Sequence, residues 1–470
     1  MTGYTRMNLQ IHGRSRMNMK IQIPKHANYI IKTLQHHGYE AYIVGGCVRD
    51  GVLGRTPSDW DITTSAKPLQ VKSIFNKTID TGLKHGTVTV MMEKEGFEVT
   101  TYRIDGTYED HRRPNEVAFT TSLREDLMRR DFTINAMAYN DKDGLVDMFG
   151  GLEDLEKKVI RCVGNADDRF DEDALRMLRA VRFAGQLGFT IDEEAQDAIR
   201  RKHGFLKDIS AERIQVELTK LLTSNHPELL KTAYELGMTS VFFPEFDAMM
   251  DTTQNNPHHK YNVGDHTIEV MKNIAPDKVK RLAALLHDVG KPVTKSTDDK
   301  GIDHFYDHYK VSGEMSEEIL RRLKFDNHTI KDVRHLIEWH DFRWDDESYA
   351  GIAKVRRLVS KVGIEYFEAL LELQRADILA QSSYLQDKKL EVLAQVTEIY
   401  QDVKNNHDCL TIKDLNIDGV TLIRNGIPAG KRMGIILERL LDMVIEEPKL
   451  NQRPILLELA KKINDVLIYN

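Results

Sequence analysis

The sequence predicts an α+β protein, with a small mixed sheet near the N-terminus followed by a long all-helical region. Between residues 24 and 150, short apolar runs with strand spacing alternate with helical patterns. From about residue 168 to the end, nearly every segment has helical spacing instead. A chain of 470 residues is also too long for one compact core, so about three domains are expected.

The elements of the N-terminal region follow from local residue patterns. Pro24 suits the first turn of a helix and precedes the amphipathic stretch NYIIKTLQHHG, residues 28–38. A further helix is expected to begin within LMRRDFTINAMAY, residues 127–139. Strands are predicted over three β-branched or apolar runs, residues 41–46, 87–93 and 97–103.

Composition excludes several classes of protein. Hydrophobic residues make up 41% and charged residues 30% of the chain, and no window approaches the roughly 18 apolar residues of a membrane span. Three cysteines that lie far apart form neither a disulfide framework nor a metal-ligand pair, which favours a reducing, cytoplasmic location. The net charge of −7 argues against a uniformly basic nucleic-acid binder, although local basic patches exist.

A glycine turn and a pair of aspartates form the first candidate site. Gly45 and Gly46 end a predicted strand, where backbone N–H groups could approach a triphosphate closely, and Arg49 would add a charged contact. In an extended strand, Asp59 and Asp61 project from one side, and like charges so close are stabilised by a divalent cation. Mg²⁺ is the expected ion, since it prefers oxygen ligands shared with substrate phosphates.

Seven motifs in order, between about residues 40 and 225, resemble those of the class II tRNA nucleotidyltransferases. This family of the polymerase β-like superfamily contains the CCA-adding enzymes and bacterial poly(A) polymerases. The resemblance implies a small mixed-sheet nucleotidyltransferase head followed by an all-α neck, body and tail. The motifs are GGCVRDGVLG, SDWDITT, TGLKHGTVTV, FEVTTYR, RRDFTINAMA, RFDEDALRMLRAVRFA and ISAERIQVELTKLL.

The resemblance also implies roles for individual head residues. Asp59 and Asp61 would hold the two metal ions of a phosphoryl transfer to an RNA 3′-hydroxyl. Arg130 would contact the nucleotide, and Asp131 would act as a further catalytic carboxylate. Glu98, on the neighbouring strand, is the alternative for this third acidic role, and the sequence does not separate the two.

Nucleotide selection is expected in DEDALRMLRAVR, residues 171–182. On one helix, Asp173 and Arg176 share a face, with Arg179 and Arg182 along roughly the same side. A carboxylate accepts from the amino group of cytosine or adenine, while a guanidinium donates to a ring acceptor. Uracil satisfies neither contact, so the protein itself is expected to select CTP and ATP. A helix with ordinary surface ion pairs is the alternative.

The polar segment 104–127, between a predicted strand and the RRD motif, resembles a flexible loop that relatives use when switching from C to A addition. An exposed charged linker is the competing interpretation.

Half of the histidines lie in one helical region, since nine of 18 fall between His258 and His340. Their order resembles the HD-domain phosphohydrolases, and LLHDVGKP is the most specific element. The resemblance implies a divalent metal of unknown identity that activates water for phosphoester hydrolysis. Lys291 would contact phosphate, and His308 and His340 are candidate ligands of a second metal. The implied metal ligands are His266, His287, Asp288 and Asp377.

The predicted function is a tRNA nucleotidyltransferase that adds or repairs the 3′-terminal CCA of tRNA from CTP and ATP, with an HD-domain 2′,3′-cyclic phosphodiesterase or phosphatase activity. The alternatives are a relative that adds only A or only C, a poly(A) polymerase, and an HD phosphohydrolase whose head merely recruits RNA. tRNA is the expected partner, and no association with a membrane is expected. Five segments are predicted: a poorly ordered leader over 1–23, the head over 24–150, a helical neck and body over 151–250, an HD domain over 251–381 and a tRNA-contacting tail over 382–470.

Overall fold

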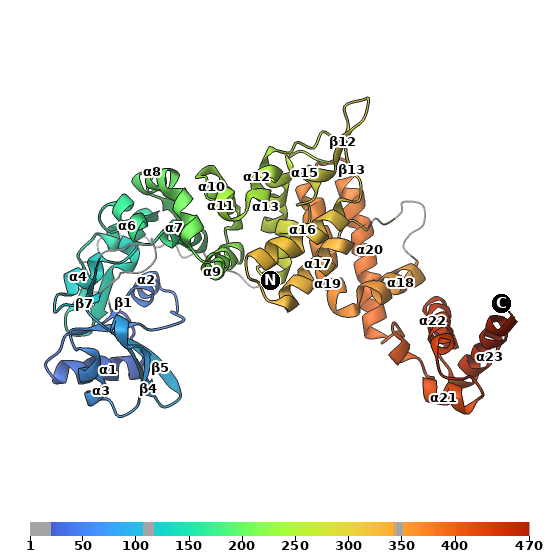
Figure 1. Ribbon diagram of the computed structural model, residues 1–470, viewed down its shortest axis with the longest axis horizontal. Coiled ribbons are helices and arrows are strands. Elements are labelled where there is room, and N and C mark those ends of the chain that lie inside the picture. The colour runs from blue at the N-terminus through green and yellow to red at the C-terminus, as the bar shows by residue number, and fades with distance from the viewer. Residues whose placement is uncertain (1–19, 107–116, 343, 345–350, 470) are drawn as a thin grey trace. The chain divides into compact units, whose positions relative to one another are not determined.

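A computed structural model describes residues 20–106, 117–342, 344 and 351–469 (Figure 1). The chain divides into two compact units, Met1–Pro244 and Glu245–Asn470. The predicted head and helical neck therefore share one unit, and the histidine-rich region lies in the other. Most of the predicted leader and the centre of the 104–127 segment lie outside the described residues.

A seven-stranded mixed sheet organises the first part of unit 1. Its strand order is β3-β4-β5-β2-β1-β8-β9, and β2 and β5 are parallel while the other neighbours are antiparallel. This confirms the predicted mixed sheet and the all-α region that follows it. The strands are β1 (Ala41–Val44), β2 (Ile62–Thr64), β3 (Thr78–Gly82), β4 (Thr87–Met92), β5 (Glu95–Thr101), β8 (Met137–Asn140) and β9 (Gly144–Asp147).

The first helix, α1 (Lys25–His36), begins directly after Pro24, as the sequence predicts. Its buried positions recur every three or four residues, so a single apolar face packs against β1 and β2. Helix α3 (Pro68–Ile74) packs against β4, β5 and α1. The buried residues of α1 are Ala27, Ile30, Ile31 and Leu34.

The prediction that a helix begins within residues 127–139 is wrong. Helix α4 (Leu123–Met128) ends before the RRD motif, a 3₁₀ turn covers Thr133–Asn135, and β8 then pairs with both β1 and β9. All four residues of β8 are buried, and its first three, Met137 to Tyr139, show no alternation of apolar and polar residues. A short apolar run of this kind has the same hydrophobic pattern in a buried strand as in a helix.

Helices make up most of the rest of unit 1. Helix α7, which carries the second part of the predicted selection motif, packs against α9. The helices not yet given are α2 (Gly46–Val52), α5 (Gly151–Lys157), α6 (Ala166–Glu172), α7 (Leu175–Leu187), α8 (Glu193–Lys202), α9 (Ala211–Leu222), α10 (Leu230–Glu235), α11 (Thr239–Phe242) and α12 (Pro244–Asp251), whose last seven residues belong to unit 2. The described part of unit 1 also contains two short strand pairs, β6 (Arg103–Asp105) with β7 (Val117–Phe119) and β10 (Val159–Ile160) with β11 (Thr190–Ile191).

Within the described residues of unit 2, the fold is helical apart from one small hairpin, β12 (Lys295–Thr297) with β13 (Asp303–Phe305). Helices α13, α14, α17 and α19 pack on one another, and three C-terminal helices, α21 to α23, enclose a separate apolar core. No described helix combines the length and apolarity needed to cross a membrane. The helices are α13 (Val263–Asn273), α14 (Lys278–Leu286), α15 (Lys291–Thr294), α16 (His308–Arg322), α17 (Asn327–Trp339), α18 (Ile352–Val362), α19 (Ile364–Ala380), α20 (Gln386–Asn405), α21 (Gly419–Arg424), α22 (Lys431–Glu446) and α23 (Arg453–Tyr469).

Candidate functional site

The glycine turn and the aspartate pair meet at one edge of the mixed sheet. Strands β1 and β2 are antiparallel, and the N–H of Val44 donates to the carbonyl oxygen of Asp61 at 3.0 Å. Asp59 and Asp61 precede β2 instead of lying within it, which corrects the predicted extended strand at these residues. Both carboxylates therefore stand where β2 begins and β1 ends.

Gly45 provides the backbone conformation of this turn, with a φ of +81° that residues other than glycine rarely adopt. A Cβ atom there would also lie 3.0 Å from Nη1 of Arg130. The Gly45 N–H donates to the carbonyl of Met137 at 3.2 Å. It is therefore engaged within the sheet, contrary to the expectation that it grips a phosphate, while Gly46 begins α2.

Arg49 is held in place by two neighbouring side chains. Its Nε and Nη2 atoms donate to the carboxylate of Asp50 at 2.9 and 3.0 Å, and Nη1 donates to Oδ1 of Asn135 at 2.8 Å. Its guanidinium carbon lies 5.1 Å from the ring centre of Phe183 on α7. Arg49 thus links the glycine turn to α7.

The aspartate pair has the electrostatics of a cation site. Burial and the neighbouring charge of Asp59 raise the pKa of Asp61 to about 6, with a smaller contribution from Glu98. The Arg130 guanidinium acts in the opposite direction. Glu98, on β5, is thus the third carboxylate close enough to influence Asp61. A bound cation would relieve the repulsion among these groups.

Asp131 is only 7% exposed and faces an arginine of α7. Nε and Nη2 of Arg179 donate to its Oδ2 at 2.9 and 2.6 Å. Its Oδ1 accepts from the Phe132 N–H at 2.8 Å and from Nδ2 of Asn135 at 3.1 Å. Although burial acts to raise the pKa of Asp131, Arg179 holds that pKa well below its usual range. Both carboxylate oxygens are therefore used inside the protein.

Asp126 is a fully buried carboxylate that the sequence interpretation missed. It accepts from Nε and Nη2 of Arg129 at 3.0 and 2.8 Å and from Oγ1 of Thr63 at 3.0 Å. Nη2 of Arg130 lies 3.7 Å away. Asp126 thereby positions the two arginines of the RRD motif. Its place three and four residues before them on α4 is the signal that could have identified it.

Asp173 lies in a break between α6 and α7, which corrects the single helix predicted over this motif. Its Oδ1 accepts from the Leu175 N–H at 3.1 Å, and Nη2 of Arg213 donates to its Oδ2 at 2.7 Å. Both oxygens are thus fixed in direction. Arg213 was contained in a recognised motif, ISAERIQVELTKLL, but was assigned no role from the sequence.

Arg176 lies on the first turn of α7, close to Asp173 in the chain. It pairs with Glu172 and donates to the carbonyl oxygens of Arg169 at 3.1 Å and Arg129 at 2.9 Å. These contacts hold the guanidinium between the RRD turn and the α6–α7 break. The backbone N–H of Arg176 also donates to the carbonyl oxygen of Asp173 at 3.0 Å.

Arg182 is buried, with 6% of its surface exposed, and its Nε donates to Oε2 of Glu217 at 2.8 Å. Its guanidinium carbon lies 3.5 Å from the ring centre of Phe183. Nη1 of Arg179 lies 3.7 Å from the other oxygen of Glu217. Arg182 and Arg179, both predicted to contact the nucleotide, thus have their charges paired with buried carboxylates inside unit 1.

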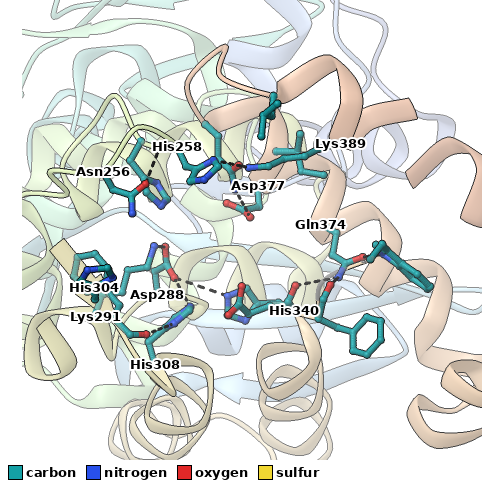
Figure 2. A pocket seen from close by; sticks show the side chains of 18 of the residues that line it. Asn256, His258, Asp288, Lys291, His304, His308, His340, Gln374, Asp377 and Lys389 are labelled. Atoms are coloured by element: carbon teal, nitrogen blue, oxygen red, sulfur yellow. Dashed lines mark hydrogen bonds and ion pairs between the residues drawn. The ribbon is translucent and has the colours of Figure 1, made fainter. Parts of the chain in front are cut away.

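The second candidate site, in unit 2, brings together all four predicted metal ligands from three segments. Figure 2 labels two of them, Asp288 and Asp377. His266 comes from α13, His287 and Asp288 follow α14, and Asp377 comes from α19. Nε2 of His266 lies 2.9 Å from Oδ1 of Asp377 and 3.6 Å from Oδ2 of Asp288. Nε2 of His287 lies 3.1 Å from the same Asp288 oxygen.

Three of these ligands meet the distance criterion for one metal ion. The ligand atoms of His266, His287 and Asp377 lie within 4.8 Å of one another. Nε2 of both histidines and both oxygens of Asp288 are buried without a hydrogen bond of acceptable geometry. Buried polar atoms without hydrogen bonds are costly, so their convergence fits a cation-binding site.

The charge of Asp288 is compensated by its neighbours. Burial acts to raise its pKa, but His287 and Lys291 hold the pKa well below the usual range of a carboxyl group. Nζ of Lys291 lies 2.7 Å from Oδ2 of Asp288 and donates to Oε1 of Gln254 at 2.8 Å. Burial and the Lys291 charge also lower the pKa of His259 to about 3.

A pocket of about 740 Å³ opens beside these ligands. Its wall is partly cationic and partly aromatic, which suits a phosphate ester attached to a flat group. Apart from the metal ligands, its wall includes Lys291, Phe305, Tyr306, Phe342, Trp344, Lys388 and Lys389.

Three family models match parts of the chain. The poly(A) polymerase head domain matches residues 41–161, the "Probable RNA and SrmB- binding site of polymerase A" matches 188–250, and tRNA nucleotidyltransferase domain 2 matches 294–460. The CCA-adding enzyme of Lactobacillus johnsonii is 39% identical over 422 residues, which cover 89% of this chain and 92% of that protein. The chain belongs to the CCA-adding enzyme family.

Two further CCA-adding enzymes show how much of the chain this family relationship covers. The enzyme of Ligilactobacillus salivarius is 35% identical over 447 residues, which cover 93% of this chain and 96% of that protein. A crystal structure of the Bacillus stearothermophilus CCA-adding enzyme in complex with CTP matches with a TM-score of 0.70 at 28% identity. That match covers 94% of this chain and 98% of the crystallised chain.

Replacement of Glu217 tests the buried ion pairs behind the selection motif. Glu217→Ala is expected to lower the free energy of unfolding by about 3 kcal/mol, because it leaves the Arg182 charge buried without its carboxylate. Urea unfolding followed by circular dichroism measures this loss. Glu212→Ala, at the exposed start of the same helix, should change stability by less than about 1 kcal/mol. Equal small losses for the two variants would contradict the assignment.

Proposed function

We propose that the chain is a tRNA nucleotidyltransferase that adds or repairs the 3′-terminal CCA of tRNA from CTP and ATP without a nucleic-acid template. The observation that carries the proposal is the aspartate pair at the sheet edge, in the same compact unit as Asp173 and Arg176. Family membership supports it, as does the CTP in the Bacillus stearothermophilus structure.

The residues at the sheet edge fit a pair of Mg²⁺ ions. Asp59 and Asp61 offer only oxygen ligands, and the raised pKa of Asp61 reflects burial together with repulsion by Asp59, which a cation would relieve. When bound, the ions would lower the pKa of the attacking 3′-hydroxyl and neutralise the leaving pyrophosphate. The chain's own part is to fix both carboxylates at the start of β2.

Glu98 is the proposed third carboxylate of this site. It acts on Asp61 electrostatically and lies on β5, which pairs with β2. Asp131, the other candidate, uses both oxygens on Arg179 and on neighbouring backbone and amide groups. Its proposed role is to hold α7 against the head.

Nucleotide selection is proposed for Asp173 and Arg176. An amino group of cytosine or adenine can donate to the Asp173 carboxylate, whose oxygens each have a second lone pair beyond the contacts to Leu175 and Arg213. Arg176 can donate to a ring acceptor. Uracil presents a carbonyl to the carboxylate, and each unmet buried contact costs about 1 to 3 kcal/mol.

A second activity, phosphoester hydrolysis, is proposed for the histidine–aspartate site of unit 2. His266, His287, Asp288 and Asp377 supply the imidazole and carboxylate ligands that transition metals accept. When bound there, a divalent metal would activate water toward a phosphate ester. A terminal phosphate or 2′,3′-cyclic phosphate on RNA is the proposed substrate, with Lys291 near the metal ligands as the phosphate contact.

The two activities should be separable by single substitutions. Asp59→Ala is expected to reduce CTP and ATP incorporation at least about 1,000-fold, because it removes an inner ligand of the Mg²⁺ ions. It should leave cyclic-phosphate hydrolysis unchanged, and His287→Ala should do the reverse. The assay supplies each labelled nucleotide separately to tRNA ending before CC, before A, or with a 2′,3′-cyclic phosphate. Wild-type extension by Asp59→Ala would contradict the assignment.

Neutral substitutions distinguish the two candidates for the third carboxylate. Glu98→Gln should raise the Mg²⁺ concentration for half-maximal nucleotide incorporation severalfold at unchanged melting temperature, because it removes charge near Asp61. Asp131→Asn should instead lower the melting temperature, since it weakens the Arg179 pair. If only Asp131→Asn raised the Mg²⁺ requirement, Asp131 and not Glu98 would be the third carboxylate of the metal site.

Selectivity is tested through Asp173. Asp173→Ala should increase UTP incorporation relative to CTP by about 10-fold or more, because the carboxylate no longer rejects the uracil O4 atom. The ratio of kcat/KM values for the two nucleotides on tRNA ending before CC measures this change. Asp171→Ala, on the preceding helix, serves as the control. An unchanged ratio for Asp173→Ala would rule out selection by this carboxylate.

A further inference from the structure

We infer that the mouth of the unit 2 pocket binds the unpaired terminal nucleoside of an RNA, with the base stacked on Tyr306. This rests on the phosphoester hydrolysis proposed above and names what the substrate must carry besides its phosphate. Tyr306 is a specificity residue of this site. The subsite requires a base but accepts any of the four.

Tyr306 lines the pocket and is 72% exposed. A single exposed apolar residue needs no explanation by itself. This ring, however, is held in one orientation, because it stacks on His304 with the ring centres 5.5 Å apart and the planes 7° apart. His304 can cover only one face of the ring. The other face is therefore available to a second flat group.

The orientation of His304 is itself fixed by the turn of the β12–β13 hairpin. Nε2 of His304 donates to Oδ2 of Asp298 at 3.1 Å, since a carboxylate only accepts. Oδ1 of Asp298 accepts from the backbone N–H groups of Lys300 and Ile302 at 2.9 and 3.0 Å. The hairpin thus orients His304, and His304 orients Tyr306. A ring that is oriented before binding loses little conformational entropy when a base stacks on it.

The chain neighbours of Tyr306 connect it with the proposed metal site. Phe305 ends β13, and its ring centre lies 5.3 Å from Nζ of Lys291, the proposed phosphate contact. The same Nζ lies 2.7 Å from Oδ2 of Asp288. His308 lines the pocket, and its Nε2 lies 3.3 Å from Oδ1 of Asp288. Residues on both sides of Tyr306 thus lie beside the proposed phosphate position, and about 740 Å³ leaves room for one nucleotide.

An unusual backbone conformation follows Tyr306. Asp307 has a φ of +53°, in the left-handed region that aspartate tolerates better than most residues. Helix α16 begins at the next residue, so Tyr306 belongs to neither β13 nor α16. Leu385, with a φ of +55°, lines the same pocket. Strained backbone of this kind is frequent at ligand-binding sites.

The wall offers little means of distinguishing one base from another. Amide side chains suit the edges of bases, but the three in the described wall already bond within the protein. Stacking depends little on base identity. The subsite therefore differs from the proposed selection residues of unit 1, because it treats uracil and cytosine alike. The partners of the amides are His340 and Phe342 for Gln374, Asp377 and Lys389 for Gln381, and His258 for Asn256.

Positive charge on α20 suits the RNA backbone that leads to the terminal nucleoside. Lys388 and Lys389 both line the pocket. Figure 2 shows Lys389 from α20 and His304 from β13 on different sides of Asp288 and Asp377. Cationic side chains combined with an aromatic platform are typical of sites for single-stranded nucleic acid.

Hydrolysis of two matched substrates tests the inference. Adenosine 2′,3′-cyclic phosphate and methyl riboside 2′,3′-cyclic phosphate share the reacting group, and only the first has a base. We expect the full chain to favour the first by about 10-fold or more in kcat/KM, because of stacking. Tyr306→Ala should reduce this ratio toward one without changing kcat/KM for the base-free substrate, and Tyr306→Phe should retain the ratio. Uridine and cytidine 2′,3′-cyclic phosphates should give kcat/KM values within about threefold of each other.

A binding measurement tests the subsite without turnover. The fluorescence of 2-aminopurine riboside 2′,3′-cyclic phosphate is quenched when its base stacks on an aromatic ring. The full chain should quench it, and Tyr306→Ala should quench it much less. Asp298→Asn, which weakens the hydrogen bond that orients His304, should give intermediate quenching. Tyr29→Ala removes a ring that is 55% exposed on α1 in unit 1, and as the control it should change neither measurement.

The possible results separate this subsite from the hydrolase activity. If the full chain hydrolyses neither cyclic phosphate, the proposed hydrolysis is wrong, and the quenching alone decides whether the base stacks on Tyr306. Equal kcat/KM values for the two wild-type substrates would overturn the inference. So would a ratio, or a quenching, that Tyr306→Ala leaves unchanged. Because the comparison of substrates uses the unmodified chain, it does not depend on a variant that folds.

Discussion

The ion pair between Asp131 and Arg179 joins the turn before β8 to α7. Asp131 is buried and the Arg179 side chain is 32% exposed, and Arg179 also lies near Glu217, which pairs with Arg182. Breaking such a pair leaves an uncompensated buried charge, so α7 is strongly constrained relative to the sheet. Asp173 stands directly before α7, and the position of the proposed selection residues relative to Asp61 therefore depends on this contact.

The pocket of unit 2 follows a different principle. His308 and His340 in its wall, and His287 beside it, use one ring nitrogen to satisfy a backbone carbonyl and present the other to Asp288. The backbone thus sets ring orientation before any ligand arrives, which reduces the conformational entropy lost on binding. Unit 1 positions its charged groups with other charged side chains, whereas unit 2 positions these imidazoles with backbone carbonyl groups.

Much of the fold could be predicted because the informative residues are local. Pro24 and an apolar face marked α1, and β-branched runs marked β1, β4 and β5. The four residues of the histidine–aspartate set were chosen from the sequence, and the structure brings them together. The break at Asp173 and the burial of Arg182 were not predicted. Both depend on Arg213 and Glu217, more than 30 positions later in the chain, so no local pattern reveals them.

Asp173 is anchored by a backbone N–H and by Arg213. In a protein that selects bases with this carboxylate, the sequence of the added nucleotides would be determined by the protein. A polymerase with a nucleic-acid template copies whichever strand it is given. Here, the orientation of one carboxylate, at the break between two helices, would determine which base is joined. Only a mutation in the gene that encodes the protein could then change the added sequence, and every tRNA in the cell would receive the same 3′ end.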